Sequence, residues 1–86
     1  MQIIKGKEAE FKQWCNIHLK DEYDAMVVRA VKRVGNAIDR GTDFKKAFFS
    51  AGKKIGLSGY QGQILQEIIR VFHPKGEDFK REVNWV

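Results

Sequence analysis

Three arginines in the first half of the chain stand at helical spacing and carry side chains suited to binding an anion. Arg29, Arg33 and Arg40 are accompanied by Asn36 on the same stripe and by Lys32 beside it. The spacing i, i+4, i+7, i+11 keeps these side chains on one face of an α-helix. Each guanidinium is a planar fork of donors that matches a phosphate or a carboxylate. The stripe therefore predicts a surface for an anionic partner, and a solvated helix face is the alternative that the sequence leaves open.

The positive charge of the chain is concentrated around this stripe. The 86 residues include 16 Lys or Arg and 11 Asp or Glu, which gives a net charge of +5. Residues 29–54 carry eight basic and two acidic side chains, whereas the rest of the chain has a net charge of −1. Such a cluster suits a nucleic-acid backbone, because each neutralised phosphate releases counterions. The predicted contact residues are Arg29, Lys32, Arg33, Arg40, Lys45, Lys46, Lys53 and Lys54.

The second half of the chain has the order and size of a helix-turn-helix unit, with its turn at 56–59. In such a unit the second helix meets base edges, where Gln pairs with adenine and Arg with guanine. We therefore predict that Gln63, Gln66 and Arg70 add base recognition. Gly62 stands where these units usually bury a branched apolar residue, so an αα-hairpin with a polar outer face is the competing interpretation.

Two aromatic residues are candidates for anchoring a partner. Phe49 departs from the apolar stripe of its predicted helix and lies beside Lys45, Lys46 and Lys53. An exposed aromatic ring among cations makes a mixed binding patch; burial under the first helix or the tail is the alternative. Trp85, near the end of the sequence, poses the same choice between closing the core and joining an interface.

The sequence indicates no catalytic site, metal site or cofactor. Cys15 and His18 stand at i and i+3, and His73 follows the last long helix. A metal site needs three or four ligands, and no further ligand stands at motif spacing. No nucleotide-binding loop or Ca²⁺ loop is present. We therefore expect a protein that is not an enzyme.

Helical periodicity extends over most of the chain. Apolar residues recur every three or four positions, and no convincing alternating strand is present. This pattern predicts an all-α fold and a single domain over residues 1–86, with four main helices and a short fifth helix or docked tail. The expected helices cover 8–19, 22–40, 43–54 and 58–72, and the tail covers 76–86.

Residues at the expected helix ends supply caps. Asp21, Thr42 and Ser58 are expected as N-caps, and Gln61 completes a capping box with Ser58. Pro74 disfavours helical geometry at the residue before it, so the last long helix is expected to end there. The apolar faces of the first two helices are expected to include Leu19 and Tyr23, respectively.

Composition also bears on compartment and partners. Cys15 cannot pair within the chain, which favours a reducing cytoplasm. Unbroken apolar runs reach four residues at most, far short of the roughly 20 that span a bilayer, so no membrane association is expected. The sequence leaves open whether the chain forms a homodimer. The leading hypothesis is a small regulatory protein that binds nucleic acid, with DNA favoured; the alternative is a protein-interaction module whose basic face binds an acidic or nucleic-acid-associated protein.

Overall fold

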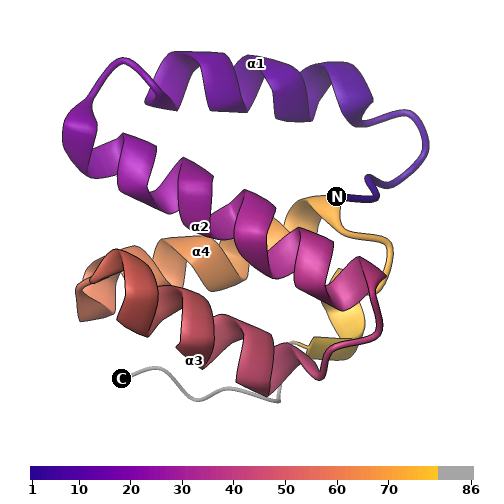
Figure 1. Ribbon diagram of the computed structural model, residues 1–86. Coiled ribbons are helices and arrows are strands. Elements are labelled where there is room, and N and C mark those ends of the chain that lie inside the picture. The colour runs from indigo at the N-terminus through magenta and orange to yellow at the C-terminus, as the bar shows by residue number, and fades with distance from the viewer. Residues whose placement is uncertain (80–86) are drawn as a thin grey trace.

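The computed structural model describes residues 1–79, and this part of the chain is folded into helices joined by short turns (Figure 1). It contains α1 (Glu8–His18), α2 (Glu22–Asp39), α3 (Phe44–Ile55), α4 (Gly59–Phe72) and the 3₁₀-helix η1 (Gly76–Phe79). The predicted all-α fold is confirmed, and each predicted main helix is found within about one residue of its expected ends. Within the described residues, no helix combines the length and apolar character needed to cross a membrane.

The central element is α2, which contacts α1, α3 and α4. Figure 1 shows α1 on one side of α2, with α3 and α4 on the other. The regular spacing of Val27, Val31, Val34 and Ile38 puts these side chains on one buried face. Because α2 is covered on several sides, its exposed residues are confined to the remaining polar stripe.

Large apolar side chains from α3 and α4 complete the core. Phe44 and Phe48 of α3, with Leu65 and Ile69 of α4, are buried against the valines of α2. The first helix joins this core more loosely, since Cys15 is its one fully buried residue. Burial raises the pKa of the Cys15 thiol, although nearby Lys32 acts in the opposite direction.

The cap of α3 differs from the sequence prediction. The sequence predicts Thr42 in this position, but the cap is Asp43, whose carboxylate accepts a hydrogen bond from the backbone N–H of Lys46 at 3.2 Å. Asp43 lies three residues before that donor, as an N-cap requires, and its negative charge also suits the helix N-terminus. The prediction of Thr42 is therefore wrong by one position.

The turn between α3 and α4 follows the sequence closely. Gly56 ends α3 in the left-handed conformation, with φ of 80°, which glycine adopts without a steric penalty. Ser58 and Gln61 form the predicted capping box, with reciprocal backbone contacts of 3.2 and 2.9 Å. The Gln61 amide also donates to the Tyr23 carbonyl at 2.9 Å, which ties the start of α4 to the start of α2.

Two residues expected on apolar faces are exposed. Leu19 is 47% exposed because it follows the last turn of α1, beyond the part that packs on α2. Tyr23 is 44% exposed in the first turn of α2, and its hydroxyl contacts the Ser58 hydroxyl at 3.2 Å. The last long helix ends at Phe72 before Pro74, as predicted, and η1 supplies a short fifth helix. Residues 80–86, including Trp85, lie outside the described part.

Candidate nucleic-acid interface

All eight predicted basic contact residues are exposed, but the structure does not place them in one site. Arg33, Arg40 and Lys46 line a single hollow between α2 and α3. Arg29 and Lys32 on α2 lie outside its lining, as do the remaining lysines of α3, Lys45, Lys53 and Lys54. The site therefore has a compact centre with further cations on the same two helices.

We call this hollow the basic groove. Its volume is about 530 Å³. The lining from α2 is Arg33, Asn36 and Ala37 with the C-cap of that helix, Arg40, and the lining from α3 is Lys46, Ala47 and Ser50. Thr42, in the connection between the helices, also lines the groove. Three of these side chains are basic and none is acidic, so the groove presents a positive potential with hydrogen-bonding groups between its cations.

The cations of the basic groove have no carboxylate partner among the described residues. Within residues 1–79, Arg33, Arg40 and Lys46 form no ion pair. Arg29, by contrast, lies 3.6 Å from Glu22, in an exposed pair of the kind that contributes little to stability. The two described arginines without a carboxylate partner thus line the same hollow.

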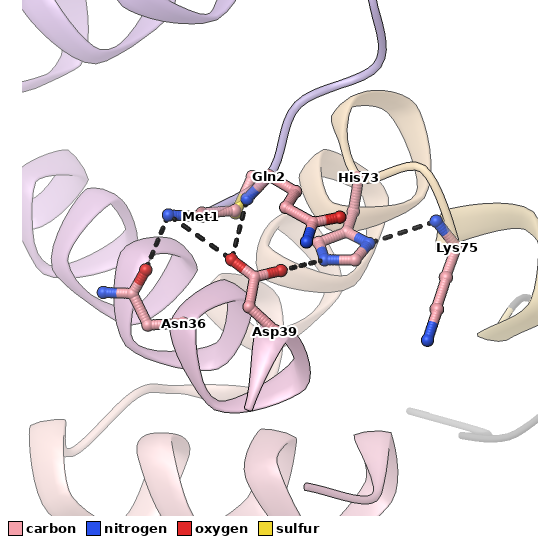
Figure 2. Close-up of polar contacts among 6 residues, drawn as sticks. All are labelled: Met1, Gln2, Asn36, Asp39, His73 and Lys75. Atoms are coloured by element: carbon pink, nitrogen blue, oxygen red, sulfur yellow. Dashed lines mark hydrogen bonds and ion pairs between the residues drawn. The ribbon is translucent and has the colours of Figure 1, made fainter. Parts of the chain in front are cut away.

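The nearest acidic residue on α2, Asp39, does not line the basic groove. Asp39 Oδ1 accepts a hydrogen bond from Nε2 of His73 at 2.9 Å, and Oδ2 accepts from the backbone N–H of Gln2 at 2.8 Å (Figure 2). His73 is only 1% exposed. The Lys75 backbone N–H donates to the other ring nitrogen, Nδ1, which assigns the proton to Nε2. Both carboxylate oxygens of Asp39 are therefore hydrogen-bonded, one to His73 at the end of α4 and the other to the N-terminal segment.

These contacts also affect the pKa of Asp39. Burial by itself raises the pKa of the Asp39 carboxyl, but hydrogen bonds from His73 and the Gln2 backbone, with positive charge nearby, outweigh it. The net effect lowers the pKa of Asp39 below its usual value. Close by, the Met1 amino group donates a hydrogen bond to Asn36 Oδ1 at 2.6 Å (Figure 2). Asn36, which lines the basic groove, is therefore held by the same N-terminal segment that contacts Asp39.

Comparisons with known proteins give no relative for this chain. No protein-family model, curated protein or solved structure matches it. What the protein does must therefore be inferred from the geometry and charge of the described residues.

The residues predicted to read bases lie in a second, separate hollow. Gln63, Gln66, Glu67 and Arg70 of α4 line it. Arg70 pairs with Glu67 and, at 3.2 Å, with Glu77 of η1. The hydrogen bond from Arg70 to Glu67 is the main cause that raises the pKa of Arg70. Two acids thus neutralise this arginine, and base recognition by α4 stays a prediction without further support.

Phe49 is exposed rather than buried under α1, and residues 80–86 of the tail, the other predicted cover, lie outside the described residues. The residue is 46% exposed, on the side of α3 that faces away from the core. Its ring meets buried Phe48 edge-on, with centroids 5.5 Å apart and an interplanar angle of 90°. Trp85, the other predicted anchor, lies outside the described residues.

Sequence reasoning missed several residues of these sites. Thr42 and Ser50 line the basic groove, and Ser50 stands one helical turn after Lys46, a spacing that could have indicated it. The contact between Asp39 and His73 joins residues 34 positions apart, and no local pattern signals it. Within residues 1–79, no group of three or more ligand side chains is placed to hold a metal ion.

Proposed function

We propose that this protein binds nucleic acid, with DNA as the expected partner, through the basic groove and the cations around it. The observation that carries the proposal is the convergence of Arg33, Arg40 and Lys46 on one hollow that no carboxylate lines. Guanidinium groups without a carboxylate partner form paired hydrogen bonds with phosphate oxygens. Asn36 and Ser50 supply neutral polar groups of the kind that also contact phosphates.

A salt titration with charge variants tests this proposal. Fluorescence anisotropy of a labelled DNA of about 20 nucleotides, single-stranded and as a duplex, gives the affinity between about 50 and 200 mM salt. The double variant Arg33→Gln/Arg40→Gln should weaken binding at least roughly tenfold. It should also reduce the salt slope by about 0.7 to 0.9 for each phosphate that the protein no longer neutralises.

The matched control removes the same charge elsewhere. Lys12→Gln/Lys20→Gln changes two exposed lysines at α1 and its end, outside the basic groove. This variant should lose much less affinity than the groove variant. An equal loss in both, or no binding of either DNA at the lower salt concentration, would overturn the proposal.

The second candidate function is binding to an acidic protein surface, which the exposed ring of Phe49 favours. An aromatic anchor beside cations suits a protein interface as well as a nucleic acid. In that case the purified protein should fail to bind DNA. The immobilised chain should then retain protein from nuclease-treated lysate, and the Arg33→Gln/Arg40→Gln variant should not.

A further inference from the structure

The basic groove has the size of a small-molecule site but not the usual lining of one. Its volume of about 530 Å³ falls within the range of about 300 to 1,000 Å³ that small-molecule sites occupy. Such sites are lined mainly by apolar and aromatic side chains, whereas Ala37 and Ala47 are the only apolar residues among the described residues that line this groove. The groove therefore offers little to the apolar part of a ligand, and its binding groups suit a small polyanion.

The polar side chains of the basic groove can donate hydrogen bonds from three parts of the fold. Arg33 and Arg40 come from α2 and its C-cap, Lys46 and Ser50 come from α3, and Thr42 comes from the connection between them. A phosphate group presents three strong acceptor oxygens, so it can use donors on several sides, whereas a carboxylate has two oxygens in one plane. This arrangement favours a phosphate over a carboxylate ligand.

The amide of Asn36 adds a further donor to the basic groove. Its Oδ1 accepts a hydrogen bond from the Met1 amino group at 2.6 Å, and Figure 2 shows this oxygen turned toward Met1 and the amide nitrogen turned away from it. Because Asn36 lines the groove, the part of its amide that remains for a ligand is the nitrogen, which only donates. A ligand rich in acceptor oxygens suits such a group.

The charge and spacing of the groove cations favour two linked phosphates over one. Arg33 and Arg40 stand seven residues apart, which is about 10 Å along the axis of α2. One phosphate monoester carries a charge of about −1.5 to −2 at neutral pH, less than the combined charge of Arg33, Arg40 and Lys46. A diphosphate brings more negative charge and spans more of the distance between the two arginines.

We propose that the basic groove binds the diphosphate group of a small molecule, whether inorganic or carried by a nucleoside. The phosphate oxygens accept hydrogen bonds from Arg33, Arg40 and Lys46, with Asn36 and Ser50 as further donors. This site goes beyond the proposed function, because it takes a small ligand and does not depend on nucleic-acid binding. Where both ligands bind, diphosphate competes with nucleic acid for the same cations.

Isothermal titration calorimetry with four anions tests the ligand class. Inorganic diphosphate, adenosine diphosphate, orthophosphate and citrate are titrated into the full chain, in a metal-free buffer of constant ionic strength. Both diphosphates should bind at least roughly tenfold more tightly than orthophosphate or than citrate, which supplies carboxylates in place of phosphates; this factor corresponds to about one charge-assisted hydrogen bond. No binding of either diphosphate, or equal binding of orthophosphate or citrate, would overturn the proposal.

The two diphosphates identify the part of the ligand that is recognised. They should bind within about fivefold of each other, because a stacked base would add about that factor or more. A larger difference between adenosine diphosphate and inorganic diphosphate would overturn the assignment of recognition to the diphosphate group alone.

Charge variants test the location of the site. Arg33→Gln/Arg40→Gln should weaken the binding of inorganic diphosphate at least roughly tenfold, whereas the control Lys12→Gln/Lys20→Gln should change it little. Lys46→Gln should also weaken binding, and Lys46→Arg, which keeps a cation on α3, should retain it. Circular dichroism checks that each variant folds. An equal loss in the groove and control variants would overturn the location.

A parallel titration with labelled DNA separates this site from the proposed function. DNA binding without diphosphate binding overturns only the small-ligand site, whereas diphosphate binding without DNA binding overturns only the proposed function. If both bind, saturating inorganic diphosphate at constant ionic strength should displace the labelled DNA. DNA that stays bound under these conditions would overturn the competition for one groove.

Discussion

Asp39 and Asp43 both lie in the basic cluster of residues 29–54, but different hydrogen-bond donors surround their carboxylates. Asp43 caps α3 with one backbone contact, whereas Asp39 joins the buried ring of His73 to the backbone of Gln2. From the sequence, both are acids that offset the basic cluster. In the structure, the Asp39 carboxylate is hydrogen-bonded to His73 and to the Gln2 backbone, and it does not line the basic groove. Its negative charge therefore offsets the groove cations less than the sequence suggests.

The contact between Asp39 and His73 should make stability depend on pH. Because the pKa of Asp39 is lowered on folding, its carboxylate stabilises the fold above the unfolded pKa of about 3.9. This contribution is lost as the pH falls through the folded pKa. Asp39→Ala removes the acceptor of a buried donor and should cost about 1 to 3 kcal/mol at neutral pH.

Urea unfolding at pH values of about 7, 5 and 3, on either side of the ordinary aspartate pKa, measures the effect. The difference between the unchanged protein and Asp39→Ala should be similar at the two higher pH values and smaller at the lowest. Glu10→Ala, which changes an exposed acid on α1, serves as control and should have little effect throughout. A difference for Asp39→Ala that stays constant down to the lowest pH would contradict the role given to its charge.

At the scale of the elements, the start of α4 offers a test of the predicted cap. Ser58→Ala removes the hydroxyl that accepts from the Gln61 backbone and also contacts the Tyr23 hydroxyl. The loss of an N-cap of this kind costs about 0.5 to 2 kcal/mol. The free energy of unfolding should therefore fall by about 1 kcal/mol.

Ser50→Ala is the matched control, because it makes the same change inside α3 rather than at a cap. Alanine has the higher helix propensity, so Ser50→Ala should leave the free energy of unfolding unchanged within about 0.5 kcal/mol or raise it slightly. If Ser58→Ala and Ser50→Ala lower the free energy of unfolding equally in urea, the cap position of Ser58 adds no stability beyond that of a serine inside a helix.

The helices were predictable because each depends on local periodicity and local caps. The spacing of the valines in α2 and the pair Ser58 and Gln61 in α4 depend on neighbours within a few residues. The basic groove was only half predictable. The sequence assigns Arg33 and Arg40 to one stripe, but the rotation of α3 that brings Lys46 and Ser50 opposite them depends on packing of the whole core.

For the whole molecule, the fold class follows from the absence of alternating patterns, and the charge bias follows from counting residues. The structure was needed to show that these polar residues line two separate hollows. Gln63 and Arg70 have the spacing of a recognition helix, yet Glu67 and Glu77 neutralise that arginine. Glu77 belongs to η1, and only the folding of η1 against α4 brings the two together.

The basic groove should also lower the stability of the free protein. Arg33, Arg40 and Lys46 are like charges gathered around one hollow, and their repulsion opposes folding until an anion or dissolved salt screens it. Lys46→Gln removes one of these charges with little change in helix propensity. At low salt this variant should raise the free energy of unfolding by about 0.5 kcal/mol, which corresponds to roughly 2 to 4 °C in Tm for a domain of this size.

The salt dependence of this gain separates electrostatic effects, which include that of Lys46 on the N-terminus of α3, from any packing effect of the substitution. At about 1 M salt, where charges are screened within about 3 Å, the difference between Lys46→Gln and the unchanged protein should disappear. Lys12→Gln, an equal charge change on α1, should produce no such rise at low salt. A lower Tm for Lys46→Gln at low salt would show that the groove cations do not repel one another, and that the fold already balances their charge.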